Sequence, residues 1–220
     1  MPADLATKTV PPVQSDAVPS KGQRTREKIL DIAFESVIAK GFAATSIEEL
    51  VAEAGITKSG FFYHFKDKAD LAQQMLDRYF AETSDLLDVL ERRAHELSDD
   101  PLHAYLVYLK LYAETMTELV AGLPGCIVAT ITFQERAFGR DVRALNSAGV
   151  DTWRKRGRVW LENIVAVYPP KLPVDIDDLA DSQLSMIIGA IAMSKAMRDP
   201  QAVGRHVMQY RDHIRLLFIP

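Results

Sequence analysis

The sequence contains a single cysteine, Cys126, among its 220 residues. One cysteine excludes an internal disulfide and is typical of proteins from a reducing cytoplasm, which is where we expect this chain. Long hydrophobic runs are also missing. The longest stretch without a charged residue, 119–134, contains glycine and proline and is shorter than the roughly 18 residues that a membrane-spanning helix needs. We therefore expect no membrane partner.

An excess of positive charge is absent as well. The formal net charge is −4, and the segment 21–70 has eight basic and eight acidic residues. This balance excludes the broad positive surface with which some proteins bind nucleic acid indiscriminately. Any contact with DNA must therefore come from a few well-placed side chains.

Motifs of the common enzyme classes are missing too. The sequence has no glycine-rich phosphate loop, no nucleophile motif and no spacing of histidine, cysteine and carboxylates that suits a metal. We therefore expect neither an enzyme nor a metal or other cofactor. An enzyme is the first alternative to a DNA-binding protein. The second is a helical interaction module that does not bind DNA.

Helical periodicity, in contrast, runs along nearly the whole chain after Gly22. Apolar residues at the spacing of one helix face predict nine helices and an all-α fold. Residues 127–131 would also suit a buried strand, but the sequence offers no second strand to pair with it. Residues 1–20 are rich in proline and alanine, and this composition predicts a disordered arm. The same residues lack the apolar core of a secretory signal.

The most informative pattern follows the first predicted helix. Thr45 or Ser46 can cap a short helix, because both side chains accept hydrogen bonds from backbone N–H groups. Gly55 then forms a tight turn, and Thr57 can cap a second short helix that begins at Lys58. This layout is that of a helix-turn-helix, in which the second helix presents its first residues to base edges in the major groove of DNA.

The segment 24–71 resembles the TetR family of bacterial transcriptional regulators. Beyond this segment only the all-helical layout and the length agree with the family. The chain departs from the family pattern at Ser59 and Gly60, where many relatives have Gly then Thr, and at Phe62, where many have a tyrosine whose hydroxyl meets a phosphate. The positions that carry the resemblance are Phe42, Thr45, Ile47, Leu50, Ala52, Ala54, Gly55, Ile56, Lys58, Phe65, Lys66, Lys68 and Leu71.

The resemblance implies a three-helix DNA-binding domain over residues 21–67 and a larger helical ligand-binding and dimerisation domain over residues 68–220. It further implies a repressor that binds a palindromic operator in double-stranded DNA as a homodimer. A small-molecule effector would release this dimer from the operator.

The resemblance also implies roles for individual residues in DNA binding. Lys58 can donate to guanine, and a hydroxyl such as that of Ser59 can serve either kind of base. Glu48 would repel DNA if it pointed at the groove, so we expect it to face solvent or to pair with Lys58. Phe61, Phe62 and Phe65 are interpreted as core residues. The predicted DNA-binding residues are Thr45, Ser46, Thr57, Lys58, Ser59, Gly60, Tyr63, His64 and Lys68.

Aromatic and methionine side chains between the motif and the C-terminus are candidates for an effector pocket, although residues at this spacing also suit a plain core. Cys126 is a candidate redox sensor at a helix start, where a helix dipole lowers the pKa of a thiol; inert packing is the alternative. The candidate pocket residues are Met75, Tyr79, Tyr105, Tyr108, Tyr112, Met116, Phe133, Trp153 and Trp160.

The last two predicted helices are candidates for the dimer interface. The run 184–193 is too apolar for one solvent-exposed helix, and its small residues permit close helix approach. A central helix of the domain's own core is the alternative. The candidate interface residues are Leu184, Ile188, Ile191 and Ala192.

Overall fold

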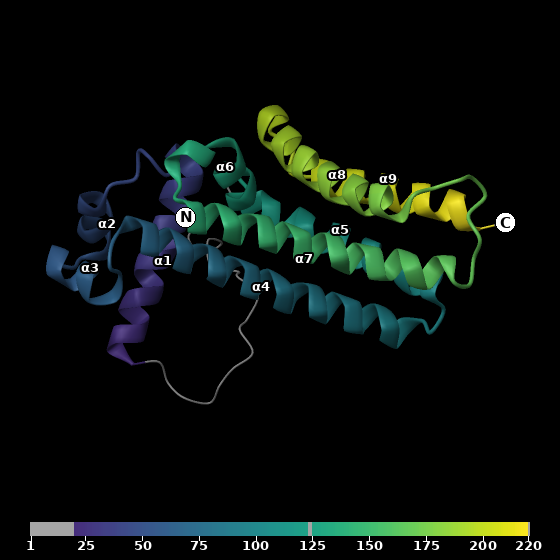
Figure 1. Cartoon of the computed structure of the whole chain (residues 1–220), viewed down its shortest axis with the longest axis horizontal. Coiled ribbons are helices and arrows are strands. Elements are labelled where there is room, and N and C mark those ends of the chain that lie inside the picture. Colours follow the sequence, from purple (N-terminus) through teal and green to yellow (C-terminus); the bar gives the residue numbers. More distant parts are fainter. Residues whose placement is uncertain (1–19, 123–124, 220) are drawn as a thin grey trace, which may run out of the picture. The chain divides into compact units, whose positions relative to one another are not determined.

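The computed structural model describes residues 20–122 and 125–219. Every regular element in these ranges is helical (Figure 1), with nine α-helices and one 3₁₀ helix, so the predicted all-α fold is confirmed. Residues 127–131, which also suited a strand, lie in a helix. The elements are α1 (Lys21–Lys40), α2 (Ile47–Ala54), α3 (Lys58–His64), α4 (Lys68–Leu97), α5 (Pro101–Gly122), α6 (Ile127–Phe133), η1 (Glu135–Ala137), α7 (Arg140–Val165), α8 (Ile176–Met197) and α9 (Ala202–Phe218).

Local capping signals set where the first two helices begin. Ser20 and Gln23 form a capping box, in which each side chain accepts a hydrogen bond from the backbone N–H of the other. Ser46 and Glu49 form the same arrangement at the start of α2. The predicted arm thus lies outside the described residues except for Ser20, which caps α1. Gly41 ends α1 with a φ of 86°, a value that favours glycine.

The described residues form two compact units. The motif unit comprises residues 20–83 and 125–149, and the bundle unit comprises residues 84–122 and 150–219. The predicted domain boundary at residue 67 falls inside the motif unit. The first part of α4, together with α6 and the start of α7, therefore groups with the helix-turn-helix.

The motif unit has a hydrophobic core of its own. α1 packs against α2 and α6, and α2 packs against α3. Ile29 and Leu30 of α1 and Phe61 of α3 are fully buried, and each such side chain stabilises the fold by about 1.5–3 kcal/mol. These contacts hold the short α3, which is too short to be stable in isolation.

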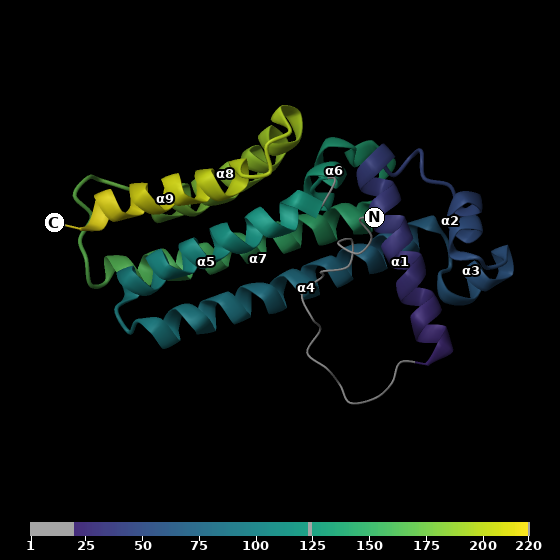
Figure 2. The ribbon, with the colours of Figure 1, turned by 180° about the vertical axis from the view of Figure 1, so that it is seen from behind.

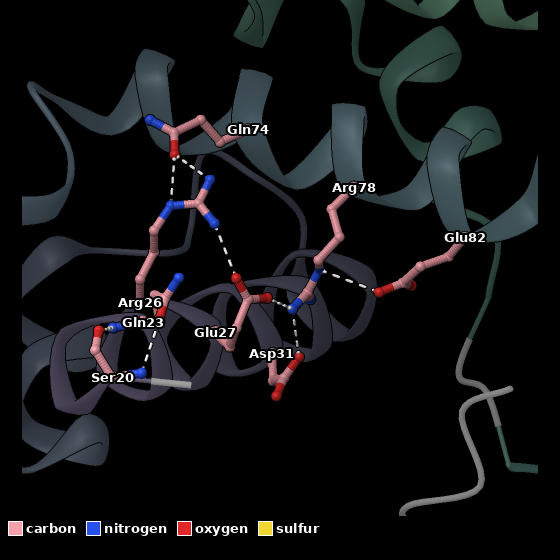
Figure 3. A network of polar contacts seen from close by, with 8 residues as sticks. All are labelled: Ser20, Gln23, Arg26, Glu27, Asp31, Gln74, Arg78 and Glu82. Atoms are coloured by element: carbon pink, nitrogen blue, oxygen red, sulfur yellow. Dashed lines mark hydrogen bonds and ion pairs between the residues drawn. The ribbon is translucent and has the colours of Figure 1, made fainter. Parts of the chain in front are cut away.

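Polar contacts join α1 to the first part of α4 within the motif unit (Figure 3). Arg26 donates from Nε and Nη2 to Oε1 of Gln74, at 3.1 and 2.6 Å. Arg78 donates from Nη1 to Glu27 at 2.9 Å and forms an ion pair with Asp31 at 2.8 Å. The guanidinium of Arg78 is largely buried, and the carboxylates around it raise its pKa although burial alone opposes its charge.

The bundle unit is built around α5, α8 and α9. α9 packs on both α5 and α8, and the three helices run alongside one another in both views (Figures 1 and 2). Gly204 of α9 permits this approach, because a Cβ atom there would lie 2.2 Å from Oγ1 of Thr117 and 3.2 Å from the carbonyl oxygen of Ala113. Both of these neighbours belong to α5.

Candidate nucleic-acid interface

The turn between α2 and α3 has the geometry that the sequence predicts. Gly55 adopts the left-handed conformation, with φ 70° and ψ 36°. Oγ1 of Thr57 then accepts a hydrogen bond from the backbone N–H of Gly60 at 3.1 Å and caps α3, which begins at Lys58. The predicted start of the second helix is therefore confirmed.

The helix α3 has one buried and one exposed side. Phe61 and Phe65, one turn apart, are buried against the core of the motif unit. Lys58 and Ser59 are exposed, and 83% of the Tyr63 surface is accessible. The start of α3 thus presents polar side chains outward from an apolar base.

The prediction that Phe62 is a core residue is wrong. Its side chain is 47% exposed, and its ring and the Phe61 ring are T-shaped to each other, with centroids 5.4 Å apart. The reason is helical geometry, since each residue turns by about 100° from the previous one and two adjacent side chains cannot share one narrow face. Phe62 therefore lies on the same outward side as the polar residues of α3.

Glu48 and Lys58 form the ion pair that the sequence analysis allows for. Nζ of Lys58 donates to Oε1 of Glu48 at 2.7 Å, and both side chains are largely exposed. The hydrogen bond from Lys58 holds the pKa of the Glu48 carboxyl below its usual value. The hydroxyls of Thr57 and Ser59 lie 3.1 Å apart beside this pair.

The prediction that Thr45 offers a hydroxyl and an N–H group to DNA is wrong. Thr45 is buried, its Oγ1 donates to the carbonyl oxygen of Gly41 at 3.0 Å, and its N–H donates to Phe42. The hydroxyl also lies 3.0 Å from that of Ser36. Ser46 is half-buried and caps α2, so its predicted phosphate contact stays a prediction.

Lys68 holds the turn after α1. Its Nζ donates to the carbonyl oxygen of Phe42 at 2.5 Å and lies 4.3 Å from the centre of the Phe42 ring. Burial lowers the pKa of this ammonium. Sequence reasoning missed this structural role, because a carbonyl 26 residues away leaves no signal in a local pattern. The phosphate contact of Lys68 stays a prediction, as does the role of the half-buried His64.

Comparison with known proteins places this motif in a family. Residues 29–75 match the model of the bacterial regulatory proteins of the tetR family. Over these residues the chain is similar to that family. The match covers α2, α3 and parts of α1 and α4, which are the elements that form the helix-turn-helix described above.

Similar proteins are designated transcriptional regulators. The transcriptional regulator AcrR of Shigella flexneri is 31% identical over 99 residues, which are 44% of this chain and 45% of that protein. The chain thus spans about half the length of that relative. The transcriptional regulator AcuR of Cereibacter sphaeroides is 23% identical over 90% of this chain and 93% of its own.

Solved structures of TetR-family proteins share the fold of this chain. The regulatory protein TetR from Rhodobacter sphaeroides superimposes with a TM-score of 0.70 at 22% identity, over 86% of this chain and 98% of that one. A TetR-family regulator from Agrobacterium tumefaciens gives a TM-score of 0.74 at 20% identity, over 88% and 98%. At 20–22% identity these similarities show that the chain shares the fold of these proteins, and they show the fold alone.

The candidate pocket residues fall into both units. Tyr105, Tyr108 and Trp160 are buried and stacked in the bundle unit, and Tyr112 stacks on Tyr108. Burial raises the pKa of Tyr105, whose hydroxyl donates to Oε1 of Gln183 at 3.1 Å. Sequence reasoning missed Gln183, since a glutamine that follows Asp181 and Ser182 looks like a surface residue.

The remaining candidates behave differently from one another. Met116 and Trp153 pack at the edge of the bundle core, whereas Met75 and Tyr79 belong to the motif unit. The interpretation of Phe133 as a pocket residue is wrong, because its side chain at the end of α6 is 81% exposed. Its position in the sequence suited the apolar face of a helix. The short α6, however, buries the opposite side, which carries residues such as Ile131.

The thiol of Cys126 does not have the environment expected of a redox sensor. Cys126 is the residue before α6, and burial raises the pKa of its thiol, while hydrogen bonds from backbone groups only partly oppose this effect. The N–H groups at the start of α6 lower this pKa as expected, but the net change is a rise. Desolvation is the larger effect, and the structure favours the alternative of inert packing.

The candidate interface residues lie along α8. Leu184 and Ile188 are half-buried, and Ile191 packs against the bundle core. Ala192 is exposed, as is half of the Met193 surface. The apolar run is thus divided between the unit's own core and an outward side.

Two kinds of site are absent from the described part of the chain. No group of three or more histidine, cysteine or carboxylate side chains in these ranges is placed to hold a metal ion. None of the described helices combines the length and the hydropathy of a membrane span.

Proposed function

We propose that this chain is a transcriptional repressor that binds double-stranded DNA through α3. The observation that carries the proposal is the orientation of α3. Lys58 and Ser59 at its start are exposed, whereas Phe61 and Phe65 are buried and anchor the helix in the core of the motif unit. A helix seated in this way can enter the major groove, which is about 12 Å wide, and bring its first residues to base edges. The TetR-family match over the same residues supports this role.

We further propose that the chain acts as a homodimer paired through α8 and α9. A single short helix reaches few base pairs, whereas a twofold partner supplies a second copy of α3 about 34–36 Å away, one turn of DNA, or a near multiple of it. Exposed apolar side chains on these helices support the pairing, namely Met193, Met197 and Leu216. The operator would then be palindromic.

A small-molecule effector would control release from the operator. The stacked aromatic side chains of Tyr105, Tyr108 and Trp160 provide apolar surface, and Gln183 and the tyrosine hydroxyls provide polar groups. In one form of the dimer the two α3 helices cannot fit successive major grooves of DNA. A ligand that binds this form more tightly shifts the population of dimers toward release from the operator. A shift from 1:99 to 99:1 requires about a 10⁴-fold preference for that form.

The first experiment is a titration of the chain with random-sequence duplex DNA at two salt concentrations. A dimer that neutralises about eight phosphates gives a slope near −7 for the logarithm of the binding constant against the logarithm of the salt concentration. A helical interaction module without DNA binding gives no signal or a signal that does not depend on salt. Fluorescence anisotropy of a labelled duplex measures the slope.

Replacement of Lys58 by alanine tests the assignment of α3. Its ammonium is the exposed cation at the start of the helix, so Lys58→Ala should weaken operator binding by about 1–3 kcal/mol and relax base preference at one position. Lys66→Ala, which removes the same charge from the exposed segment after α3, should weaken all sequences similarly. The assignment would be contradicted if both variants had the same ratio of affinities for matched and mismatched operators.

Replacement of Ala192 by arginine tests the dimer. Ala192 is exposed on α8, so Ala192→Arg leaves the monomer folded but places a charge in the proposed interface. We expect sedimentation velocity to show a shift from dimer to monomer at micromolar concentration, because an unpaired charge is costly in an apolar interface. Ala144→Arg, at an exposed site on α7, is the control and should leave the dimer intact.

A further inference from the structure

Two neighbouring glutamates of α2 hold lysines of the motif unit. Oε1 of Glu48 accepts from Nζ of Lys58 at 2.7 Å, and Oε2 of Glu49 accepts from Nζ of Lys40 at 2.6 Å. All four side chains are exposed to solvent by 40% or more of their surface. The positive charge of the motif is therefore partly neutralised within the protein before DNA arrives.

The two glutamates differ in what else they do. Glu49 also accepts a hydrogen bond from the backbone N–H of Ser46 at 3.2 Å and completes the capping box of α2. Its presence is explained by the stability of the helix. Glu48 is outside the capping box, and its carboxylate is committed to the residue that opens α3. Glu48 also lies in the first turn of α2, where a carboxylate suits the helix dipole, but this role does not require its ion pair with Lys58.

The pair of Glu48 and Lys58 presents a donor and an acceptor side by side. An ammonium has three N–H groups, so Lys58 can keep its bond to Glu48 and still donate to N7 and O6 of a guanine. The second carboxylate oxygen of Glu48 can accept from the N4 amino group of a cytosine. A G·C pair offers these acceptors and this donor together in the major groove.

The same carboxylate opposes other partners. Thymine O4, guanine O6 and phosphate oxygens are all acceptors, and a carboxylate that faces one of them instead of an amino group has no proton to share. Like charges close together also repel. Glu48 is thus suited to lowering the affinity for duplexes that do not place an amino group opposite it.

We propose that Glu48 is a specificity-determining residue, which together with Lys58 reads one G·C pair in each half-site and weakens binding to duplexes that lack it. The inference rests on the proposed function, because it requires that α3 enters the major groove. It adds a second reader, on α2, and it assigns the base pair.

The test is selection of bound sequences from a random duplex library by the full-length chain and by Glu48→Ala, Glu48→Gln and Glu53→Ala variants. Glu53 is an exposed glutamate on the same helix, five residues further along and about 140° around it. Its replacement changes the net charge as Glu48→Ala does, so it controls for charge alone. Circular dichroism verifies that each variant is folded.

We expect the unaltered chain to enrich sequences with one strongly preferred G·C pair in each half-site. Glu48→Ala should lose about tenfold or more of the preference at that pair, keep the others, and bind random-sequence duplex more tightly. Glu48→Gln should retain the bond to Lys58 but tolerate further base pairs, because an amide both donates and accepts. Glu53→Ala should select the original sequences.

Two results would overturn the inference while leaving the proposed function intact. One is that Glu48→Ala selects the same sequences with the same preference at every position. The other is that it weakens binding to all duplexes equally, as expected if Glu48 merely stabilised the motif. If the unaltered chain enriched no sequence at all, the proposed function itself would fail together with the inference.

Discussion

Replacement of Phe61 by alanine should lower the free energy of unfolding of the motif unit by about 3–5 kcal/mol. The Phe61 side chain is fully buried, and its ring lies 5.4 Å from the centroid of the Phe65 ring. Truncation removes this apolar surface from the core and leaves a cavity that a seven-residue helix cannot close without shifting. Because a whole domain is stable by only about 5–15 kcal/mol, most of the stability of the unit would be lost.

The neighbouring residue provides a matched control. Phe62 has the same side chain on the same helix but is 47% exposed, so Phe62→Ala should cost less than about 1 kcal/mol. Urea denaturation followed by circular dichroism measures both variants. Phe61→Ala should also lose DNA binding in proportion to its unfolded fraction. Similar denaturation midpoints for the two variants would contradict the orientation of α3 described above.

Replacement of Trp160 by alanine should have an effect of similar size on the bundle unit, about 3–5 kcal/mol. The indole is buried and stacks at 5.4 Å on Tyr105, at 5.5 Å on Tyr108 and at 4.7 Å on the imidazole of His95. Aromatic pairs of this kind stabilise a fold beyond the area that they bury. The substitution removes three of these pairs at once.

Two further variants separate this packing from other effects. Trp160→Phe retains an aromatic ring and should lose clearly less stability than the alanine variant. Val159→Ala alters the preceding residue of α7, which is 54% exposed, and should be close to neutral. Denaturation can be followed by the fluorescence of Trp153, the other tryptophan of the chain. An alanine variant as stable as Val159→Ala would contradict the stacked arrangement.

The helices could be predicted from the sequence because their signals are local. The cap at Thr57 lies three residues from the N–H that it serves. The turn at Gly55 depends on one residue's conformational freedom. The pairing of Glu48 with Lys58 follows from two short helices joined by that turn.

The features that the sequence did not indicate depend on distant parts of the chain. Thr45 is buried because its hydroxyl is bonded to the end of α1, and Lys68 is held by a carbonyl at the same place. Gln183 is buried because it meets a tyrosine 78 residues away. Phe133 is exposed because α6 is too short to bury two sides. The periodicity of apolar residues predicts which side of a helix is apolar, but it does not show which other part of the chain covers that side.

The contacts of Arg26 and Arg78 have a mechanical consequence. Through them the first turns of α4 are tied to α1 at two points one turn apart, Gln74 and Arg78, by charged groups that would each lose a partner if the helices slid (Figure 3). Each of these contacts is partly open to solvent and contributes about 1 kcal/mol or less, but several of them act together. We therefore expect a displacement of this part of α4 to carry α1 with it.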